Sequence, residues 1–216
     1  MAALIGFYRY RLHQKQQVLQ LENKAQALEK EKAMVMYENL KQQLNPHFLF
    51  NSLSSLSGLI DTDQQMAGDF LEHMSGIYRY ILQNSERETV ALKDELAFVK
   101  IYLQLQQTRF SKGLQVNINV AEDFHHYKIA PVTLQNMVEN AMKHNVIDSA
   151  SPLIIDIYIE GEEYIVVRNN LQRKKLVETS NKRGLPQFVS LYKYLSHLPV
   201  RIEEDETSFK ISIPLI

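Results

Sequence analysis

The first part of the chain has the hydrophobic spacing of one long helix. No proline or glycine interrupts residues 12–44, a stretch longer than a typical globular helix. Its apolar positions follow alternating spacings of three and four: Val18, Leu21, Ala25, Leu28 and Val35. Lys32 and Asn39 occupy polar positions of the same seam, as in coiled coils whose polar residues set the register. The pattern predicts a short coiled coil, most simply in a parallel homodimer.

Helical spacing returns in three further segments. Residues 52–60 are expected to continue the helical spacing after NPHFLFN and to end at a turn formed by residues 61–63. The second segment, 64–84, has one apolar face: Met66, Phe70, Met74, Ile77 and Ile81. The third segment, 92–107, has a stripe that faces its neighbours: Leu96, Val99, Leu103 and Gln107. Two antiparallel helices per chain, paired in a dimer, would make a four-helix bundle.

The periodicity changes to two in the second half of the chain, which indicates strands. Apolar and polar residues alternate along one half-buried strand: Leu114, Val116, Ile118 and Val120. Hairpins are expected over residues 153–167 and 200–213, and helices over residues 130–146 and 184–195. The pattern predicts an α+β fold, with an antiparallel or mixed sheet and helices on one of its faces.

Composition narrows the classes of function only modestly. With 45% hydrophobic and 23% charged residues, the chain is globular. Its 24 basic and 25 acidic residues leave a net charge of -1, so no overall field attracts nucleic acid, and we expect no nucleic-acid partner. The absence of cysteine excludes disulfides and thiolate metal sites. Only 7 glycines leave little room for glycine-rich phosphate loops.

The first residues resemble the end of a transmembrane helix. The apolar string MAALIGF is followed at once by Tyr8, Arg9, Tyr10 and Arg11, an order typical of interfacial tyrosines and cytoplasmic arginines. The chain lacks the roughly 20 consecutive apolar residues of a complete span. One interpretation is therefore a cytoplasmic region tethered by an upstream transmembrane segment, and the other is a disordered start or a helix cap.

Residues 45–51, NPHFLFN, are the strongest candidate for chemistry. Pro46 lacks a backbone N–H and is expected to open the helix locally, so that the His47 imidazole could be an exposed nucleophile. Asn51, one helical turn later, could hydrogen-bond the ring and select the attacking nitrogen. The alternatives are an ordinary surface histidine and an asparagine that serves as a cap or is solvated.

A second informative string, APVTLQNMVENAMKHN, begins at Ala130. Its apolar residues share one helix face: Leu134, Met137, Val138 and Ala141. The remaining positions are densely polar: Gln135, Glu139, Asn140, Lys143, His144 and Asn145. An asparagine oxygen suits Mg²⁺, and a lysine three residues later offers a positive charge to phosphate. Taken alone, the string could also be a solvated helix face.

Together, NPHFLFN and VENAMKHN resemble the LytS-type family of sensor histidine kinases. The similarity continues through YRY at 78–80, LKDEL at 92–96, QTRF at 107–110 and FKISIPL at 209–215. It therefore covers nearly all of residues 35–216, with several separated motifs in the expected order. The resemblance implies a juxtamembrane or signalling coiled coil over 1–34, dimerisation and histidine phosphotransfer helices over 35–110, and a two-layer, GHKL-type ATP-binding catalytic domain over 111–216.

The resemblance also implies roles for individual residues. His47 would accept the γ-phosphoryl group of ATP, Asn140 would hold Mg²⁺ and Lys143 would contact the phosphates. Other residues of the same helix would line the ATP pocket: Glu139, His144 and Asn145. The phosphoryl group would pass to a response regulator, and the chain would be the cytoplasmic portion of a dimeric bacterial inner-membrane protein.

Two nucleotide motifs of the family are reduced in this chain. At the DNGxG-type motif the sequence is VRNNLQ, with Asn169 in the aspartate position and Leu171 in the first glycine position. Asn169 can accept a hydrogen bond from adenine, but without the strength of a charged acceptor. The later GxGL-type motif is NKRGL, which keeps Gly184 and Leu185. The adjacent Lys182 and Arg183 could bind phosphate, or could form a solvated basic turn.

Three functions remain open at this point. The first is an ATP-dependent protein-histidine kinase that signals to a response regulator. The second is a pseudokinase of the same fold that acts as a dimeric scaffold, as the reduced nucleotide motifs would allow. The third is a GHKL ATPase without histidine phosphorylation, which leaves NPHFLFN unexplained.

Overall fold

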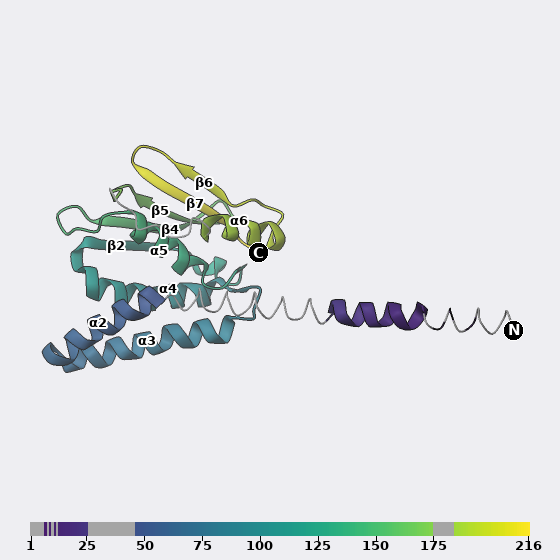
Figure 1. Ribbon diagram of the computed structural model, residues 1–216. Helices are drawn as coiled ribbons and strands as arrows, with labels where there is room; N and C mark the ends of the chain where they lie inside the picture. The colour runs from purple at the N-terminus through teal and green to yellow at the C-terminus, as the bar shows by residue number, and fades with distance from the viewer. Residues whose placement is uncertain (1–6, 8, 10, 12, 26–45, 175–183) are drawn as a thin grey trace. The chain divides into compact units, whose positions relative to one another are not determined.

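The computed structural model describes residues 7, 9, 11, 13–25, 46–174 and 184–216 (Figure 1). The chain divides into two compact units, Met1–Pro46 and His47–Ile216, and each is treated by itself. In the first unit, residues 13–25 are helical and exposed, and they carry the first three positions of the predicted coiled coil. Its remaining positions lie outside the described residues: Leu28, Lys32, Val35 and Asn39. The coiled coil itself stays a prediction.

Three helices form the first part of the second unit, in the order α2 (Pro46–Thr62), α3 (Gln64–Asn84) and α4 (Leu92–Phe110). The expected turn at residues 61–63 is shorter than predicted, because α2 continues to Thr62. Asp63 alone separates α2 from α3, and its Oδ1 accepts a hydrogen bond from the Met66 N–H at 2.9 Å. This is an N-cap, which satisfies one of the backbone donors at the start of a helix.

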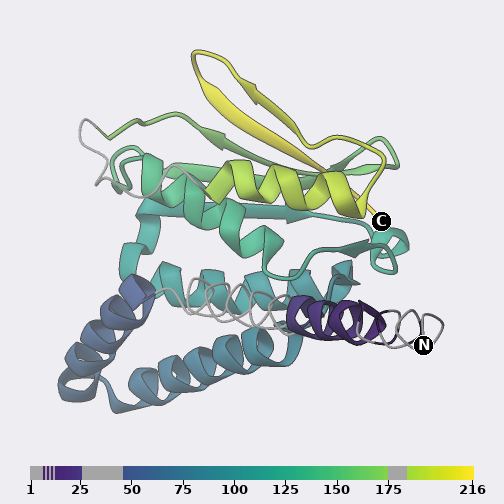
Figure 2. The same cartoon turned by 45° about the vertical axis from the view of Figure 1, so that its right-hand side comes forward.

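The apolar faces of α3 and α4 are mostly as predicted. On α3 all but one of the predicted residues are buried, and the exception, Met66, is 45% exposed. On α4, Gln107 is exposed, and additional residues are buried: Leu92, Glu95, Phe98, Tyr102, Leu105 and Gln106. The single stripe predicted for α4 was too narrow because α4 packs both against α3 and against the helix α5 (Thr133–His144) (Figure 2).

A five-stranded mixed sheet follows. Its order is β2 (Leu114–Asn119), β4 (Leu153–Glu160), β5 (Tyr164–Asn170), β7 (Ser208–Pro214) and β6 (Arg201–Glu204). Strand β2 is parallel to β4, and the other neighbours are antiparallel. The helices α5 and α6 (Gly184–Leu195) lie on one face of the sheet (Figures 1 and 2). The α+β class, the mixed sheet and both hairpins are confirmed.

A small second sheet was not predicted. Strand β1 (Val90–Ala91) pairs antiparallel with β3 (Lys128–Ile129), which joins the start of α4 to the segment before α5. Two-residue strands are too short to show a period of two along the sequence, so alternation could not indicate them. The pairing fixes the point at which the chain enters α5.

One hydrophobic core runs through the second unit. Buried residues from α3, α4, α5, α6 and the central strands form a single cluster. The sheet contributes inward-facing aliphatic residues: Ile155, Ile157, Ile165, Val167, Ile211 and Ile213. The domain boundary expected between residues 110 and 111 stays a prediction. No helix among the described residues is long and apolar enough to span a bilayer.

Candidate functional site

Helix α5 presents its predicted apolar face to the core. Its four predicted core residues are all buried: Leu134, Met137, Val138 and Ala141. The helix begins at Thr133 instead of the expected Ala130, because Val132 adopts a left-handed conformation with φ 63° that a helix cannot continue through. Of the polar residues, Gln135 and Asn145 are buried as well, Glu139 and Asn140 are half-buried, and Lys143 and His144 are exposed.

Glu139 is half-buried and is held by neighbouring polar groups. Its Oε2 accepts a hydrogen bond from Gln135 Nε2 at 2.6 Å. Gln135 also hydrogen-bonds to the hydroxyl of Tyr102 on α4, together with Gln106. Burial raises the pKa of Tyr102, and the negative charge of Glu139 raises it further. The hydroxyl therefore stays protonated, and Glu139 is oriented by an array that reaches α4.

Asn140 and Lys143 occupy the accessible edge of α5. Asn140 is half-buried and Lys143 is exposed, and within the described part of the chain neither side chain has an observed hydrogen bond or ion pair. A side-chain amide that is partly shielded and not already hydrogen-bonded can offer its oxygen to Mg²⁺, which prefers oxygen ligands and keeps several waters or phosphates. The arrangement fits a magnesium-nucleotide site.

His144 lies next to these residues in a positively charged setting. Burial lowers its pKa, and the nearby charges of Lys143, Lys174 and Arg173 lower it further. At neutral pH the ring is therefore uncharged, and it can donate or accept a hydrogen bond. The surrounding lysines and arginine supply the positive charge that would attract phosphate.

Asn145 is placed differently from the other candidates, because it is buried at the end of α5. Its Nδ2 donates to the Ala141 carbonyl at 2.8 Å, and its Oδ1 accepts from the Gln172 N–H at 2.7 Å. The backbone also pairs here, with the Val146 N–H donating to the Gln172 carbonyl at 2.7 Å. Asn145 thus clamps the segment after β5 onto α5, and a direct contact with ATP stays a prediction.

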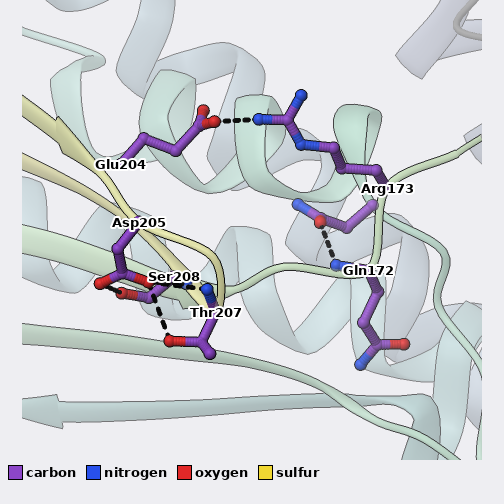
Figure 3. A network of polar contacts seen from close by, with 7 residues as sticks. Gln172, Arg173, Glu204, Asp205, Thr207 and Ser208 are labelled. Carbon is purple, nitrogen blue, oxygen red and sulfur yellow. Dashed lines mark hydrogen bonds and ion pairs between the residues drawn. The ribbon is translucent and has the colours of Figure 1, made fainter.

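The β6–β7 hairpin holds the same segment from another element. Arg173 forms an ion pair with Glu204, and the Leu171 N–H donates to the Thr207 carbonyl at 2.8 Å. Asp205 organises the hairpin turn by accepting from the Thr207 N–H and the Ser208 N–H, each at 2.7 Å (Figure 3). Residues 171–174 are therefore held in place by contacts with both α5 and the β6–β7 hairpin.

The nucleotide motifs are only partly described. Asn169 is buried in β5, and its Nδ2 donates to the Asn170 carbonyl at 2.7 Å, which leaves the side-chain oxygen as the acceptor it could offer to adenine. Gly184 begins α6, and Leu185 is half-buried and packs against the core. Lys182 and Arg183 lie outside the described residues, so their suggested role stays a prediction.

His47 lies in the first turn of α2, directly after Pro46. Proline is well suited to the first position of a helix, where its missing N–H needs no partner. The expected opening of the preceding helix concerns residues outside the described part. Asn51, one turn later, is half-buried and lines a small cavity between α2, α3 and α4, together with Arg109 of the QTRF string.

Sequence reasoning missed two residues near these candidates. Tyr102 is 1% exposed and joins α4 to both α2 and α5. Arg109 is exposed beside the cavity that Asn51 lines, where its charge could serve an anion. Arg109 belongs to the QTRF string, and the presence of that string among the family motifs could have marked Arg109 as a candidate. Tyr102 gave no comparable signal, because a tyrosine within a helix is ordinarily a core residue.

Comparison with known proteins identifies relatives of the chain. The family model described as "Histidine kinase" matches residues 35–114. "Sensor histidine kinase BtsS" of Escherichia coli K12 is 37% identical over 131 residues, which is 59% of this chain and 23% of that protein. "Sensor histidine kinase/phosphatase LytS" of Staphylococcus aureus MRSA252 is 34% identical over 131 residues, which is 61% of this chain and 22% of that protein. The chain thus matches less than a quarter of these relatives' length.

Solved structures show weaker similarity. The catalytic domain of histidine kinase ThkA aligns with a TM-score of 0.43 and 12% identity, over 58% of this chain and 95% of that one. The Acinetobacter baumannii histidine kinase AdeS aligns with a TM-score of 0.39 and 8% identity, over 77% of this chain and 94% of that one. At this level of similarity, the description of the fold depends on the chain's own helices and strands.

Proposed function

We propose that this chain, a relative of the LytS-type sensor histidine kinases, transfers the γ-phosphoryl group of ATP to its own His47 and then to an aspartate of a response regulator. The observation that carries the proposal is the pairing of two features. His47 and Asn51 lie within the region matched by the histidine kinase family. The edge of α5 offers Asn140, Lys143 and His144 beside one another, above a buried apolar face.

The chemistry at His47 requires little from the protein beyond placement. A neutral imidazole nitrogen attacks the γ-phosphorus, a nitrogen–phosphorus bond forms, and the bond to the β–γ bridging oxygen breaks as ADP leaves. Asn51 would hold the ring so that one nitrogen faces the phosphorus. The resulting phosphoramidate is labile enough to pass its phosphoryl group to a carboxylate of the partner regulator.

The α5 edge would bind and orient the nucleotide phosphates. Asn140 would hold Mg²⁺, which neutralises charge on the phosphate oxygens when bound. Lys143 would contact the phosphates as a point charge, and His144 would supply a neutral hydrogen-bonding ring. Glu139, fixed by Gln135, would line the same pocket. Because phosphoryl transfer depends mainly on positioning and charge neutralisation, these residue types are sufficient.

The base would be recognised at β5. Asn169 would accept from the adenine amino group through its side-chain oxygen. Gly184 and Leu185, at the start of α6, would line the ATP site. Asn145 would contribute indirectly, because its hydrogen bond to the Gln172 N–H holds the residues that follow β5. A GHKL-type two-layer sandwich is the architecture in which these elements would surround ATP.

Exposed apolar residues support a homodimer. On α2 they repeat along one side of the helix: Phe50, Leu53 and Ile60, which are 69%, 48% and 54% exposed. On α3, Leu71 and Leu82 are 53% and 55% exposed. Helical stripes of this kind lie buried when two hairpins pair as a four-helix bundle. The coiled coil and an upstream transmembrane region would extend the dimer toward a bacterial inner membrane, with this portion in the cytoplasm.

The pseudokinase is the second candidate. Asn169 and Leu171 replace an aspartate and a glycine of the nucleotide motif. The Leu171 N–H already donates a hydrogen bond to the Thr207 carbonyl of the β6–β7 hairpin. A chain that could not hold ATP would keep the dimeric fold and act as a scaffold. The GHKL ATPase remains the third candidate, with nucleotide hydrolysed but no phosphohistidine formed.

A nucleotide titration followed by labelling separates the three candidates. Purified protein is titrated with ATP in the presence of Mg²⁺, and then incubated with ATP labelled at the γ-phosphate. The kinase binds ATP and becomes labelled; the scaffold fails to bind or binds without labelling. Release of free phosphate from unlabelled protein identifies the ATPase. Absence of saturable ATP binding would contradict both enzymatic candidates.

A further inference from the structure

Glu95 is a buried carboxyl group on α4 that accepts hydrogen bonds from α3 and from the start of α5. The residue is 0% exposed. Its Oε1 accepts from the Tyr80 hydroxyl at 2.8 Å and from the Val132 N–H at 2.5 Å. Its Oε2 accepts from the Leu134 N–H at 3.1 Å. Tyr80 lies on α3 and Val132 and Leu134 lie at the start of α5, so one side chain joins three elements.

These hydrogen bonds replace a local cap at the start of α5. Val132 is the N-cap residue, yet its own side chain makes no capping hydrogen bond, and its φ of 63° is unfavourable for a β-branched residue. The first N–H groups of a helix lack partners within the helix, and an acidic group beside them is favoured by the helix dipole. Glu95 supplies that partner from a different helix.

The same segment is also held by α6. The Tyr192 hydroxyl accepts a hydrogen bond from the Ala130 N–H at 3.1 Å and lies 3.2 Å from Thr133 Oγ1. Tyr192 is 0% exposed, so its position is fixed by the core. The start of α5 is therefore connected both to α3 and α4, through Glu95, and to α6, through Tyr192.

The pKa values of Glu95 and Tyr80 show how strongly their burial affects the contact between α3, α4 and α5. Burial raises the pKa of Glu95 to about 7, while the hydrogen bonds from the Tyr80 hydroxyl and from the backbone of residues 132–134 lower it. Burial and then the charge of Glu95 raise the pKa of Tyr80, which keeps its hydroxyl protonated as a donor. A buried carboxyl group that loses one donor is costly, so the loss of Tyr80 would disturb the remaining contacts to α5.

We propose that Glu95 is a positioning residue through which helix α3 sets the placement of α5 and hence regulates phosphoryl transfer. The inference rests on the proposed kinase function, because α5 carries Asn140 and α3 belongs to the proposed phosphoacceptor hairpin. Asn140 lies seven residues after Thr133, about two helical turns along a rigid helix. A movement of α3 that separates Tyr80 from Glu95 would leave the buried carboxyl group short of a donor, weaken its cap on α5 and so shift Asn140.

The test begins with Tyr80→Phe. This change removes only the hydroxyl, because the ring can keep its stacking on Phe98, with centroids 4.2 Å apart. Tyr78→Phe is a matched control on the same helix, since the Tyr78 hydroxyl is buried and lacks a hydrogen-bond partner within the described part of the chain. Hydrogen exchange at the amides of residues 132–138 is measured without nucleotide. Exchange is expected to be roughly tenfold faster in Tyr80→Phe and unchanged in Tyr78→Phe.

Kinetics then separate positioning from general destabilisation. At saturating ATP, Tyr80→Phe is expected to lower the rate of autophosphorylation roughly tenfold with less than about a threefold change in KM. Glu95→Gln should slow the reaction as well, because its amide nitrogen cannot accept from the Leu134 N–H. The double variant should lose little more than either single variant, since both changes break one junction.

The outcomes distinguish the coupling from the proposed function. Unchanged exchange at the start of α5 in Tyr80→Phe would overturn the coupling, whatever the activity of the protein. Equal rate losses in Tyr80→Phe and Tyr78→Phe would also overturn it, because a general loss of packing would then explain both. If the wild-type chain takes no label from ATP, the kinase function fails, and the exchange experiment alone decides the coupling.

Discussion

The ring of Phe48 packs against the ring of Tyr102, with centroids 5.4 Å apart and planes tilted by 39°. Phe48 directly follows the proposed phosphoacceptor, and Tyr102 hydrogen-bonds through its hydroxyl to Gln135 on the proposed nucleotide helix. One buried side chain of α4 thus touches α2 through its ring and α5 through its hydroxyl. Helix α4 therefore connects the two segments that the proposed reaction must bring together.

Tyr102→Phe should destabilise the fold modestly. The substitution keeps the ring beside Phe48 but removes the hydroxyl that bonds with Gln135 and Gln106. We expect the free energy of unfolding to fall by about 1 kcal/mol, the usual contribution of a buried hydrogen bond. Urea unfolding of both proteins measures the difference. An unchanged unfolding midpoint would show that the hydroxyl is not engaged as described.

Glu95 should make stability fall as the pH rises. Its pKa is raised from 4.5 to about 7 in the folded chain, so between these values the folded state keeps a proton that the unfolded state has released. The contribution of this proton to the free energy of unfolding is complete below pH 4.5. It decreases by about 1.4 kcal/mol per pH unit above that value and is lost at about pH 7.

The comparison with Glu95→Gln isolates this titration from that of other groups. His144 has a lowered pKa and acts in the opposite direction, but it is present in both proteins. Urea unfolding at pH 5, 6, 7 and 8 should show a smaller decrease with pH in Glu95→Gln than in the wild type. Parallel pH profiles would mean that Glu95 does not titrate in this range.

Asn145→Ala should loosen the segment that follows β5. The change removes the acceptor of the Gln172 N–H and the donor to the Ala141 carbonyl, both in a buried setting. We expect the free energy of unfolding to fall by about 1–3 kcal/mol. Asn117→Ala is a suitable control, because Asn117 is exposed and bonds only at the surface, to Asp156. Equal effects of the two substitutions would contradict the clamp.

Asn140→Ala should abolish phosphorylation without disturbing the fold. The Asn140 amide is the proposed Mg²⁺ ligand, and within the described residues no protein hydrogen bond to it would be lost. Labelling by ATP should therefore disappear, while the unfolding midpoint and the elution volume in size-exclusion chromatography stay unchanged. Undiminished labelling would remove Asn140 from the mechanism.

Sequence patterns predicted the elements with regular periods. The bounds of α3 were predicted at Gln64 and Asn84, because Asp63 is a typical cap and a clear apolar face follows. Helix α6 was also predicted, and both hairpins were predicted from short strand-like runs on either side of turn residues. By contrast, α4 is buried on several sides, and a single stripe cannot represent such a helix.

Features that depend on contacts distant in the sequence could not be predicted. Glu95 is separated from Leu134 by 39 residues, and an acidic residue in the first turn of a helix ordinarily indicates a solvated position. The left-handed Val132 is flanked by hydrogen bonds from distant residues, since its N–H donates to Glu95 and the Ala130 N–H donates to Tyr192. Asn145 belongs to a polar string in which every residue suggested a ligand contact. Its side chain instead hydrogen-bonds to the backbone of Ala141 and Gln172.

The most direct measurement is the chemical stability of the label in the wild-type chain and in His47→Gln. Protein incubated with γ-labelled ATP and Mg²⁺ is divided between acid and alkali before counting. A phosphohistidine at position 47 predicts label that is lost in acid, retained in alkali and absent from His47→Gln. Label of the same stability that persists in His47→Gln, or no label on a wild-type chain that binds ATP, would contradict phosphoryl transfer to His47.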